Sequence, residues 1–195
     1  MQPEEQNNDS ELVKRVQQGD KRAFELLVLK YQHRIYSLVS RLVRDNDEVQ
    51  DVVQEAFIKA YRALPNFRGD SQFYTWMYRI AVNTAKNYLV SRSRRPQGVD
   101  VDVEEAEFMD SADGLRDLAS PESQLLTEEL RRVIDDAIAA LPEDLRTALT
   151  LREFEGLSYE EIANVMNCPV GTVRSRIFRA REAVDAAILP IHPGN

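Results

Sequence analysis

A strongly acidic segment divides this chain of 195 residues into two blocks, and it limits the possible folds more than any other feature. Residues 97–123 contain nine acidic side chains and one basic side chain, Arg116, so this stretch alone carries a charge of −8. The segment includes Gly98, Gly114 and Pro121 and lacks a sustained apolar period, so it has no hydrophobic face to bury. The sequence therefore predicts two small domains, 1–95 and 122–195, joined by a flexible acidic linker over 96–121.

Both blocks show the apolar periodicity of helices. In the first block Leu27, Tyr31, Ile35 and Leu38 recur at spacings of three and four residues, which places them on one helix face. Glycine and proline are scarce within the periodic segments, which also favours helices. The expected fold class is all-α, with two small helical domains. The residues expected to cap helix N-termini are Asp20, Asp45, Ser158 and Thr172.

Composition limits where the chain works. Its one cysteine, Cys168, cannot form an internal disulfide, which favours a reducing compartment. The polar, acidic N-terminus lacks the basic start and apolar run of a secretory signal. No stretch approaches the roughly 20 apolar residues that a membrane-spanning helix needs. We therefore expect a cytoplasmic protein.

The net charge of −8 hides two basic regions. Residues 59–95 carry eight basic side chains and one acidic side chain, and residues 172–181 carry four arginines and no acid. Screening limits the reach of a charge to about 10 Å at 0.1 M salt, so local charge decides whether phosphate is attracted. The distribution predicts one nucleic-acid surface in each domain.

The second block has the pattern of a helix-turn-helix. Two short amphipathic segments flank a tight turn at 167–171, and the second segment leaves arginines and Phe178 on its free face. Such a helix fits the major groove, where arginine pairs with guanine and an apolar ring meets a thymine methyl. Arg176 lies nearer the packed edge and is expected to hold a phosphate. The alternative is a helical hairpin with a solvated basic face.

The first block combines aromatic and basic side chains in the segment 67–79. Aromatic rings stack on unpaired bases while arginine and lysine follow the backbone, so this mixture suits single-stranded or melting DNA. Rings on neighbouring helix faces, at Phe73, Tyr74 and Tyr78, leave the predicted helix without a polar side, so it is either deeply buried or binds something. The residues expected to be core instead are Phe57, Tyr61, Trp76 and Ile80.

Several motifs together resemble one family. They are DVVQEAFIKAY at 51–61, FRGDS at 67–71, WMYRIAVN at 76–83, LPEDL at 141–145, LSYEEIA at 157–163 and GTVRSR at 171–176. In this order they resemble an extracytoplasmic-function (ECF) sigma factor of the sigma-70 family, of the sigma-E type. The resemblance extends from about residue 11 to residue 187.

This resemblance implies a role for each domain. The first would be sigma region 2, which binds the polymerase core and reads and melts the −10 element, and the second would be region 4, which reads the −35 element. The implied −10 residues are Phe67, Arg68, Asp70, Ser71, Phe73, Tyr74, Trp76, Arg79, Asn83, Lys86 and Asn87. The implied −35 residues are Thr172, Arg174, Ser175, Arg176, Phe178 and Arg179. The implied core-binding residues, on an acidic helix side, are Asp47, Glu48, Asp51, Gln54 and Glu55.

The resemblance also implies partners. They are core RNA polymerase, through its β′ clamp and β flap, and promoter DNA in duplex and single-stranded form. A cognate membrane-anchored anti-sigma factor would hold the free protein inactive at the inner membrane. The implied regulon is of the envelope-stress or alginate type.

Two rival functions are weighed against this one. A regulator that binds duplex DNA alone explains the second block, but it does not need an aromatic and basic surface beside an acidic helix. An enzyme acting on nucleic acid needs a catalytic cluster, and the histidines, His33 and His192, are far apart in the sequence. We find no metal-ligand cluster, phosphate-binding loop or nucleophile–base pair. The sequence therefore predicts no catalytic residues, metal, cofactor or small-molecule substrate.

Overall fold

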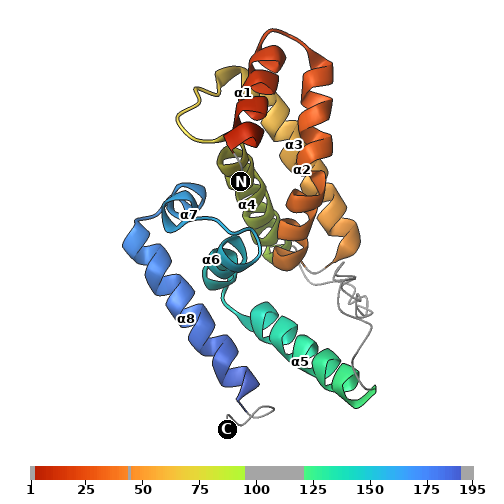
Figure 1. Cartoon of the computed structure of the whole chain (residues 1–195), viewed down its shortest axis with the longest axis vertical. Coiled ribbons are helices and arrows are strands. Elements are labelled where there is room, and N and C mark those ends of the chain that lie inside the picture. The colour runs from red at the N-terminus through yellow and green to blue at the C-terminus, as the bar shows by residue number, and fades with distance from the viewer. Residues whose placement is uncertain (1–2, 44, 95–120, 190–195) are drawn as a thin grey trace.

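The computed structural model describes residues 3–43, 45–94 and 121–189, and these residues form helices and no strands (Figure 1). The all-α prediction is confirmed. The predicted linker lies outside the described residues except for Pro121. The helices are α1 (Pro3–Gln17), α2 (Lys21–Leu42), α3 (Asn46–Ala63), the 3-10 turn η1 (Leu64–Asn66), α4 (Phe73–Ser93), α5 (Pro121–Ala140), α6 (Glu143–Glu153), α7 (Tyr159–Met166) and α8 (Val170–Ile188).

Three of the four predicted capping residues begin helices. The Asp20 carboxylate accepts from the backbone of α2, and Asp45 does the same for α3. Ser158 and Glu161 form a reciprocal capping box at α7. The prediction for Thr172 is wrong, because α8 already begins at Val170 and Thr172 lies inside its first turn.

Helices α1 to α4 form the first domain around an apolar core. Tyr31, Leu27 and Ile35 of α2 are fully buried at its centre. Helix α1 is tied to α2 by Asp9, whose buried carboxylate accepts from the Tyr31 hydroxyl and pairs with Lys30 at 2.6 Å. The α3 and α4 helices close the bundle from the other side.

Helices α5 to α8 form the second domain. Helix α8 packs against α5, α6 and α7, and α7 and α8 are joined by a tight turn in which Asn167 is left-handed, with φ of 50°. Ile162 and Val165 of α7 face Val173 and Ile177 of α8 in the core. The helix-turn-helix prediction is confirmed at the level of the backbone.

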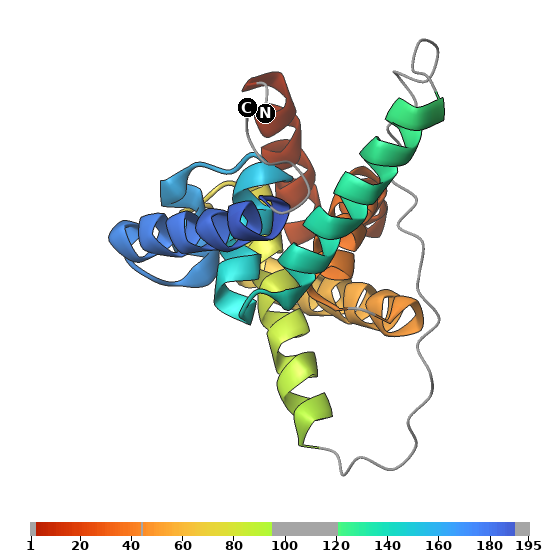
Figure 2. The same cartoon turned by 90° about the horizontal axis from the view of Figure 1, so that it is seen from below.

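The two domains are packed against each other. Helix α4 contacts α7, and α2 contacts α6, so that α6 lies between α4 and α8 (Figure 1, Figure 2). Ala148, Leu151 and Leu157 of the second domain belong to the same apolar cluster as the core of the first. The sequence left this arrangement open, because a flexible linker sets no fixed distance between the domains that it joins.

Two further observations concern the described residues as a whole. Within ranges 3–43, 45–94 and 121–189, no helix has the length and apolar character needed to cross a membrane. The same part of the chain has no group of three or more histidine, cysteine, aspartate or glutamate side chains that could hold a metal ion.

Candidate nucleic-acid interface and polymerase-binding face

Helix α8 has one packed side and one free side. Val173, Ile177 and Ala180 are buried and fix the helix against its neighbours. The ring of Phe178 is 62% exposed, so it is available to an apolar group such as a thymine methyl. The predicted −35 residues on this free side are Arg174, Ser175, Phe178 and Arg179, all of them exposed.

Two other predicted −35 residues lie at the packed edge. Thr172 is half-buried. The Arg176 guanidinium is also half-buried and donates to the carboxylate of Asp144 and to the Cys168 sulfur, 3.5 Å away. Arg176 is therefore engaged within the protein, and a phosphate contact would need this ion pair to break.

Helix α4 also has an exposed edge. Arg79, Asn83 and Asn87 follow one another at intervals of four residues, and all three are exposed. This spacing aligns them along one side of the helix. The structure thus brings three predicted −10 residues together in a row.

The loop before α4 has an exposed tip that lies above a cluster of aromatic side chains. Arg68 and Asp70 are exposed, and Gly69 between them has φ of +78°, which glycine adopts without strain. Below the tip the half-buried Phe67 ring lies 4.9 Å from the Trp76 ring and 6.4 Å from the Phe73 ring, measured between centroids. Ser71 follows the tip and is half-buried.

Phe73 and Trp76 support this loop from the core. Their side chains are buried, with 5% and 7% of their surface exposed, and the Phe73 ring also packs on Tyr31 at 5.5 Å. Phe73, predicted as a −10 residue, is thus covered by the loop and α2 in this arrangement, as expected if the helix is deeply buried. Trp76 lies in the core, as the alternative interpretation had it.

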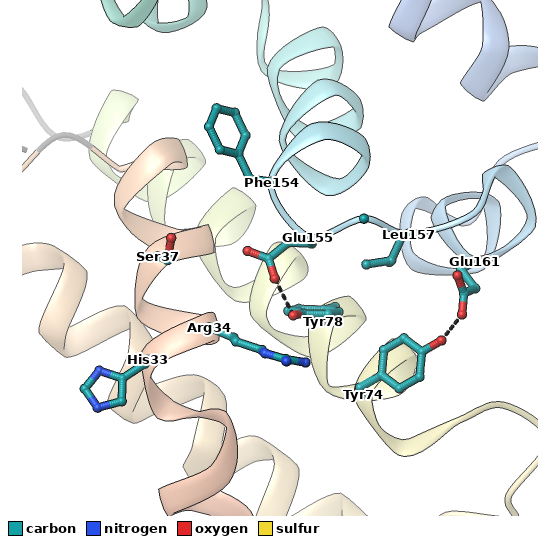
Figure 3. A pocket seen from close by; sticks show the side chains of 10 residues that line it. His33, Arg34, Ser37, Tyr74, Tyr78, Phe154, Glu155, Leu157 and Glu161 are labelled. Atoms are coloured by element: carbon teal, nitrogen blue, oxygen red, sulfur yellow. Dashed lines mark hydrogen bonds between the residues drawn. The ribbon is translucent and has the colours of Figure 1, made fainter. Parts of the chain in front are cut away.

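Two other predicted −10 residues, Tyr74 and Lys86, and the neighbouring ring of Tyr78 have partners in the second domain, and Figure 3 shows those of the two tyrosines. The Tyr74 hydroxyl donates to Glu161 of α7, and the Tyr78 hydroxyl donates to Glu155. Lys86 pairs with Asp144 of α6, with 2.7 Å between Nζ and Oδ1. The aromatic face of α4 is therefore occupied by this chain's own second domain.

A cavity of about 630 Å³ lies at this junction, between α2, α4 and the segment from α6 to α7 (Figure 3). Its lining includes Glu155, Tyr78 and Arg34. Burial raises the pKa of the Glu155 carboxyl, although the hydrogen bond from Tyr78 and the charges of Arg34 and Arg41 oppose this shift. Burial also raises the pKa of Tyr78, so its hydroxyl keeps the proton that it donates to Glu155.

The acidic side of α3 is partly as predicted. Asp47, Asp51, Gln54 and Glu55 are exposed, and Glu55 pairs with Lys59 at 2.8 Å. Glu48 differs, because its carboxylate is turned toward α4.

The Glu48 carboxylate of α3 pairs with Arg92 near the end of α4, at 2.5 Å. Burial and the hydrogen bond to Glu48 raise the pKa of Tyr88 to about 12. The prediction of Glu48 as a free docking residue is therefore not supported in this arrangement.

The same helix exposes two apolar side chains that the sequence analysis did not assign to this face. Ile58 is 43% exposed and Tyr61 is 40% exposed. The prediction that Tyr61 is core is wrong, because its ring lies at the surface against Phe24, with 4.9 Å between centroids. Charged and apolar side chains thus share one face of α3.

Comparison with known proteins identifies the family. The family model of sigma-70 region 2 matches residues 27–95, and that of sigma-70 region 4 matches residues 131–184. The RNA polymerase sigma-H factor of Pseudomonas aeruginosa is 66% identical over 186 residues, which is 95% of this chain and 96% of the relative. The ECF RNA polymerase sigma-E factor of Escherichia coli K12 is 64% identical over 187 residues, 96% of this chain and 97% of the relative. This chain is an ECF sigma factor.

The structure of this sigma factor also resembles solved ones. CnrH, solved in complex with the cytosolic domain of CnrY, has a TM-score of 0.67 and 26% identity, and the match covers 93% of this chain and 97% of CnrH. The sigma factor RpoE of Bartonella quintana, solved with the anti-sigma factor NepR, has a TM-score of 0.64 at 22% identity over 85% of this chain and 96% of that one, which supports the fold.

Family membership decides between the functions considered above. A sigma factor binds core RNA polymerase and directs initiation at promoters, and it is not itself an enzyme. The matched segments place region 2 on α2 to α4 and region 4 on the helices from α5 to α8. The rival interpretations, a regulator that acts alone and a nucleic-acid enzyme, are therefore set aside.

Proposed function

We propose that this ECF sigma factor reads −10 DNA with its 67–72 loop and the exposed edge of α4, and −35 DNA with the free side of α8. The observation that carries the proposal is the exposure of both rows of side chains on helices whose opposite sides are packed into the protein. Each row combines arginine with smaller polar groups, which is the chemistry that contacts phosphates and base edges.

For the −35 element, α8 presents two long basic side chains, one aromatic ring and one small polar residue. Arg174 and Arg179 can each reach guanine O6 and N7 with two donors, while Ser175 lets the helix approach the groove closely. Phe178 is placed to contact a thymine methyl. Arg176 and Thr172, at the packed edge, are assigned to phosphates.

For the −10 element, the tip of the loop and the edge of α4 have different tasks. Arg68 and Asp70 at the tip, with Phe67 and Ser71 beneath them, form the place where an unpaired base is held. Arg79, Asn83 and Asn87 contact neighbouring bases or phosphates. Phe73 and Trp76 act by supporting the loop rather than by touching DNA.

Reading both elements at once requires the two regions to separate. The centres of the two elements are about 25 base pairs apart, which is about 85 Å at 3.4 Å per base pair. In the packed form α4 and α8 both contact α7, a helix of eight residues and thus only about 12 Å long. Separation also uncovers Tyr74, Tyr78 and Lys86, which then become available to the −10 strand.

The polymerase contacts are assigned to surfaces outside the packed junction. The face of α3 formed by Asp47, Asp51, Gln54 and Glu55 is proposed to dock on the β′ clamp, with Ile58 and Tyr61 as apolar parts of the same face. Region 4 is proposed to contact the β flap.

We further propose a cytoplasmic sigma factor held inactive by an anti-sigma factor anchored in the inner membrane, in an envelope-stress or alginate-type regulon. The class of regulon rests on the resemblance of the sequence motifs to the sigma-E type. The structural neighbour CnrH binds the cytosolic domain of CnrY, which supports a partner of this kind.

The test is transcription in vitro from a promoter library, with purified core RNA polymerase and the full chain. We expect RNA synthesis only when both proteins are present, from templates that share a −10 and a −35 sequence. A double reversal, Asp51→Lys with Glu55→Lys, serves as the control that loses core binding. Equal transcription with and without this chain would overturn the proposal.

A further inference from the structure

We infer that Gln17, at the end of α1, is a positioning residue for the loop that holds the unpaired −10 base. The inference rests on the proposed function of that loop. Gln17 precedes residues 27–95, which match the region 2 family model, so the matched segment does not include it. Its side chain is directed at the backbone where the loop begins.

The Gln17 amide group brackets the start of the loop. Its Nε2 atom donates to the Leu64 carbonyl oxygen at 3.1 Å and to the Phe67 carbonyl oxygen at 2.9 Å. The Leu64 carbonyl also accepts from the Phe67 backbone N–H at 3.0 Å, which closes the 3-10 turn. A side-chain amide has two N–H donors, and here both reach one short turn almost fifty residues away.

The amide is held by a rigid corner. Gly19 has φ of +96° and reverses the chain after α1, and the Arg15 guanidinium donates to Asp20 across this corner at 3.0 and 2.7 Å. Leu12 and Val16, on the inner side of α1, are buried in the core. Gln17 therefore links the loop to a fixed part of the bundle rather than to a free helix end.

Phe67 is consequently fixed at two points. Gln17 holds its carbonyl oxygen, and Trp76 packs against its ring. The residues that follow, Arg68 to Asp70, are exposed, so the direction in which the tip leaves the bundle is set by how Phe67 is held. Through this connection α1 contributes to the capture of an unpaired base without touching DNA.

The experiment uses the full chain bound to core polymerase and a single-stranded oligonucleotide with the −10 sequence selected from the promoter library. An abasic residue is introduced at each position in turn. Gln17→Met removes both donors at nearly constant size, and Gln17→Lys restores a donor. Gln18→Ala is the matched control at an exposed neighbour on the same corner.

In the wild-type complex, we expect one abasic position to weaken binding by roughly tenfold, the effect of losing one base–aromatic stack. In Gln17→Met the penalty at that position should fall to about twofold, because a loosened loop no longer holds the base. Gln17→Lys should restore the larger penalty, and Gln18→Ala should leave it unchanged.

The inference is overturned if Gln17→Met keeps the full penalty, or if it weakens binding equally at every position, since a uniform loss indicates only general support of the fold. A wild-type complex with no sensitive position would instead overturn the base-holding role of the loop. The two failures are therefore distinguishable.

Discussion

Lys86 of α4 and Asp144 of α6 form an ion pair, with 2.7 Å between Nζ and Oδ1. The other carboxylate oxygen of Asp144 accepts from Arg176 of α8. The hydrogen bond from Lys86 is the largest cause that lowers the pKa of the Asp144 carboxyl, so it remains charged near neutral pH. One carboxylate thus joins the helix proposed to read −10 DNA to the helix proposed to read −35 DNA.

Asp144→Asn should shift the free chain toward the separated form. Only the pair with Lys86 joins the two domains, and a partly exposed pair contributes about 0.2–1 kcal/mol, so the ratio of packed to separated form should fall about 1.5- to fivefold. Energy transfer between fluorophores on α3 and α8 measures this ratio. Asp136→Asn, at an exposed position of α5, is the control. Unchanged transfer in Asp144→Asn would show that the ion pair with Lys86 does not hold the domains together.

Glu155→Gln should make the folded chain more stable at neutral pH. Burial raises the pKa of Glu155 above 4.5, so the folded chain binds this proton more tightly than the unfolded chain. The free energy of unfolding therefore decreases as the pH rises from 4.5 through the raised pKa. Glutamine can still accept from the Tyr78 hydroxyl but carries no charge.

Denaturant unfolding between pH 4 and pH 7 measures the effect of Glu155→Gln. The variant and the wild type should be similar at the acidic end, and the variant should gain relative stability as the pH rises. Glu160→Gln, at an exposed position of α7, controls for the loss of one negative charge. A constant difference across this pH range would contradict the assignment.

Asn83→Ala should damage use of the −10 element and spare polymerase binding. Asn83 is exposed between Arg79 and Asn87 on α4, and it supports no part of the core. Loss of a base contact should weaken open-complex formation by about 1–3 kcal/mol. Permanganate reactivity of unpaired thymines measures the melted DNA, and co-purification measures polymerase binding. Normal melting in the variant would exclude Asn83 from the interface.

Arg174→Ala should relax the −35 preference. Arg174 is exposed near the start of α8, where a reading helix meets base edges. The discrimination between the selected −35 sequence and a scrambled one should fall by about 1–3 kcal/mol. Competition binding with holoenzyme measures this. An equal loss on both sequences would assign Arg174 to the phosphate backbone instead.

Reversing the charge of Glu55 or Asp51 should weaken binding to core polymerase. Both carboxylates are exposed on α3, and neither supports the core, so the fold should survive. Charge-reversed residues at a docking face usually reduce the association rate most. Surface plasmon resonance at two salt concentrations measures the rate at which the variant associates with core polymerase. The matched control is Glu25→Lys, at an exposed position of α2.

The local elements of this fold were predictable from the sequence because each has a short-range cause. The side chains of Ser158 and Glu161 each accept a hydrogen bond from the other residue's backbone N–H within a single turn. The Asp20 side chain, directly after Gly19, accepts from the first backbone N–H groups of α2. The prediction failed at Thr172, where the chain already becomes helical directly after Pro169. A residue whose side chain can cap a helix does not mark the helix start when the preceding turn has already begun the helix.

The parts that were not predictable depend on distant contacts. The sequence showed that the helix with Tyr74 and Tyr78 has no polar side, but it did not show what covers that side. The partner lies about eighty residues later, at Glu155 and Glu161, and no periodic pattern connects the two segments. Gln17 was missed for the same reason, since an exposed glutamine at a helix end has no distinguishing neighbours in the sequence.

The packing of Leu151 and Leu157 against the first domain has a consequence for how this factor finds its targets. A protein whose competent conformation is a minor population binds its ligand with an affinity reduced by that fraction. If polymerase favours the separated form, as the proposed function requires, it removes this penalty, and promoter binding then belongs to the assembled holoenzyme. The free factor would then bind nonspecific chromosomal sites only weakly.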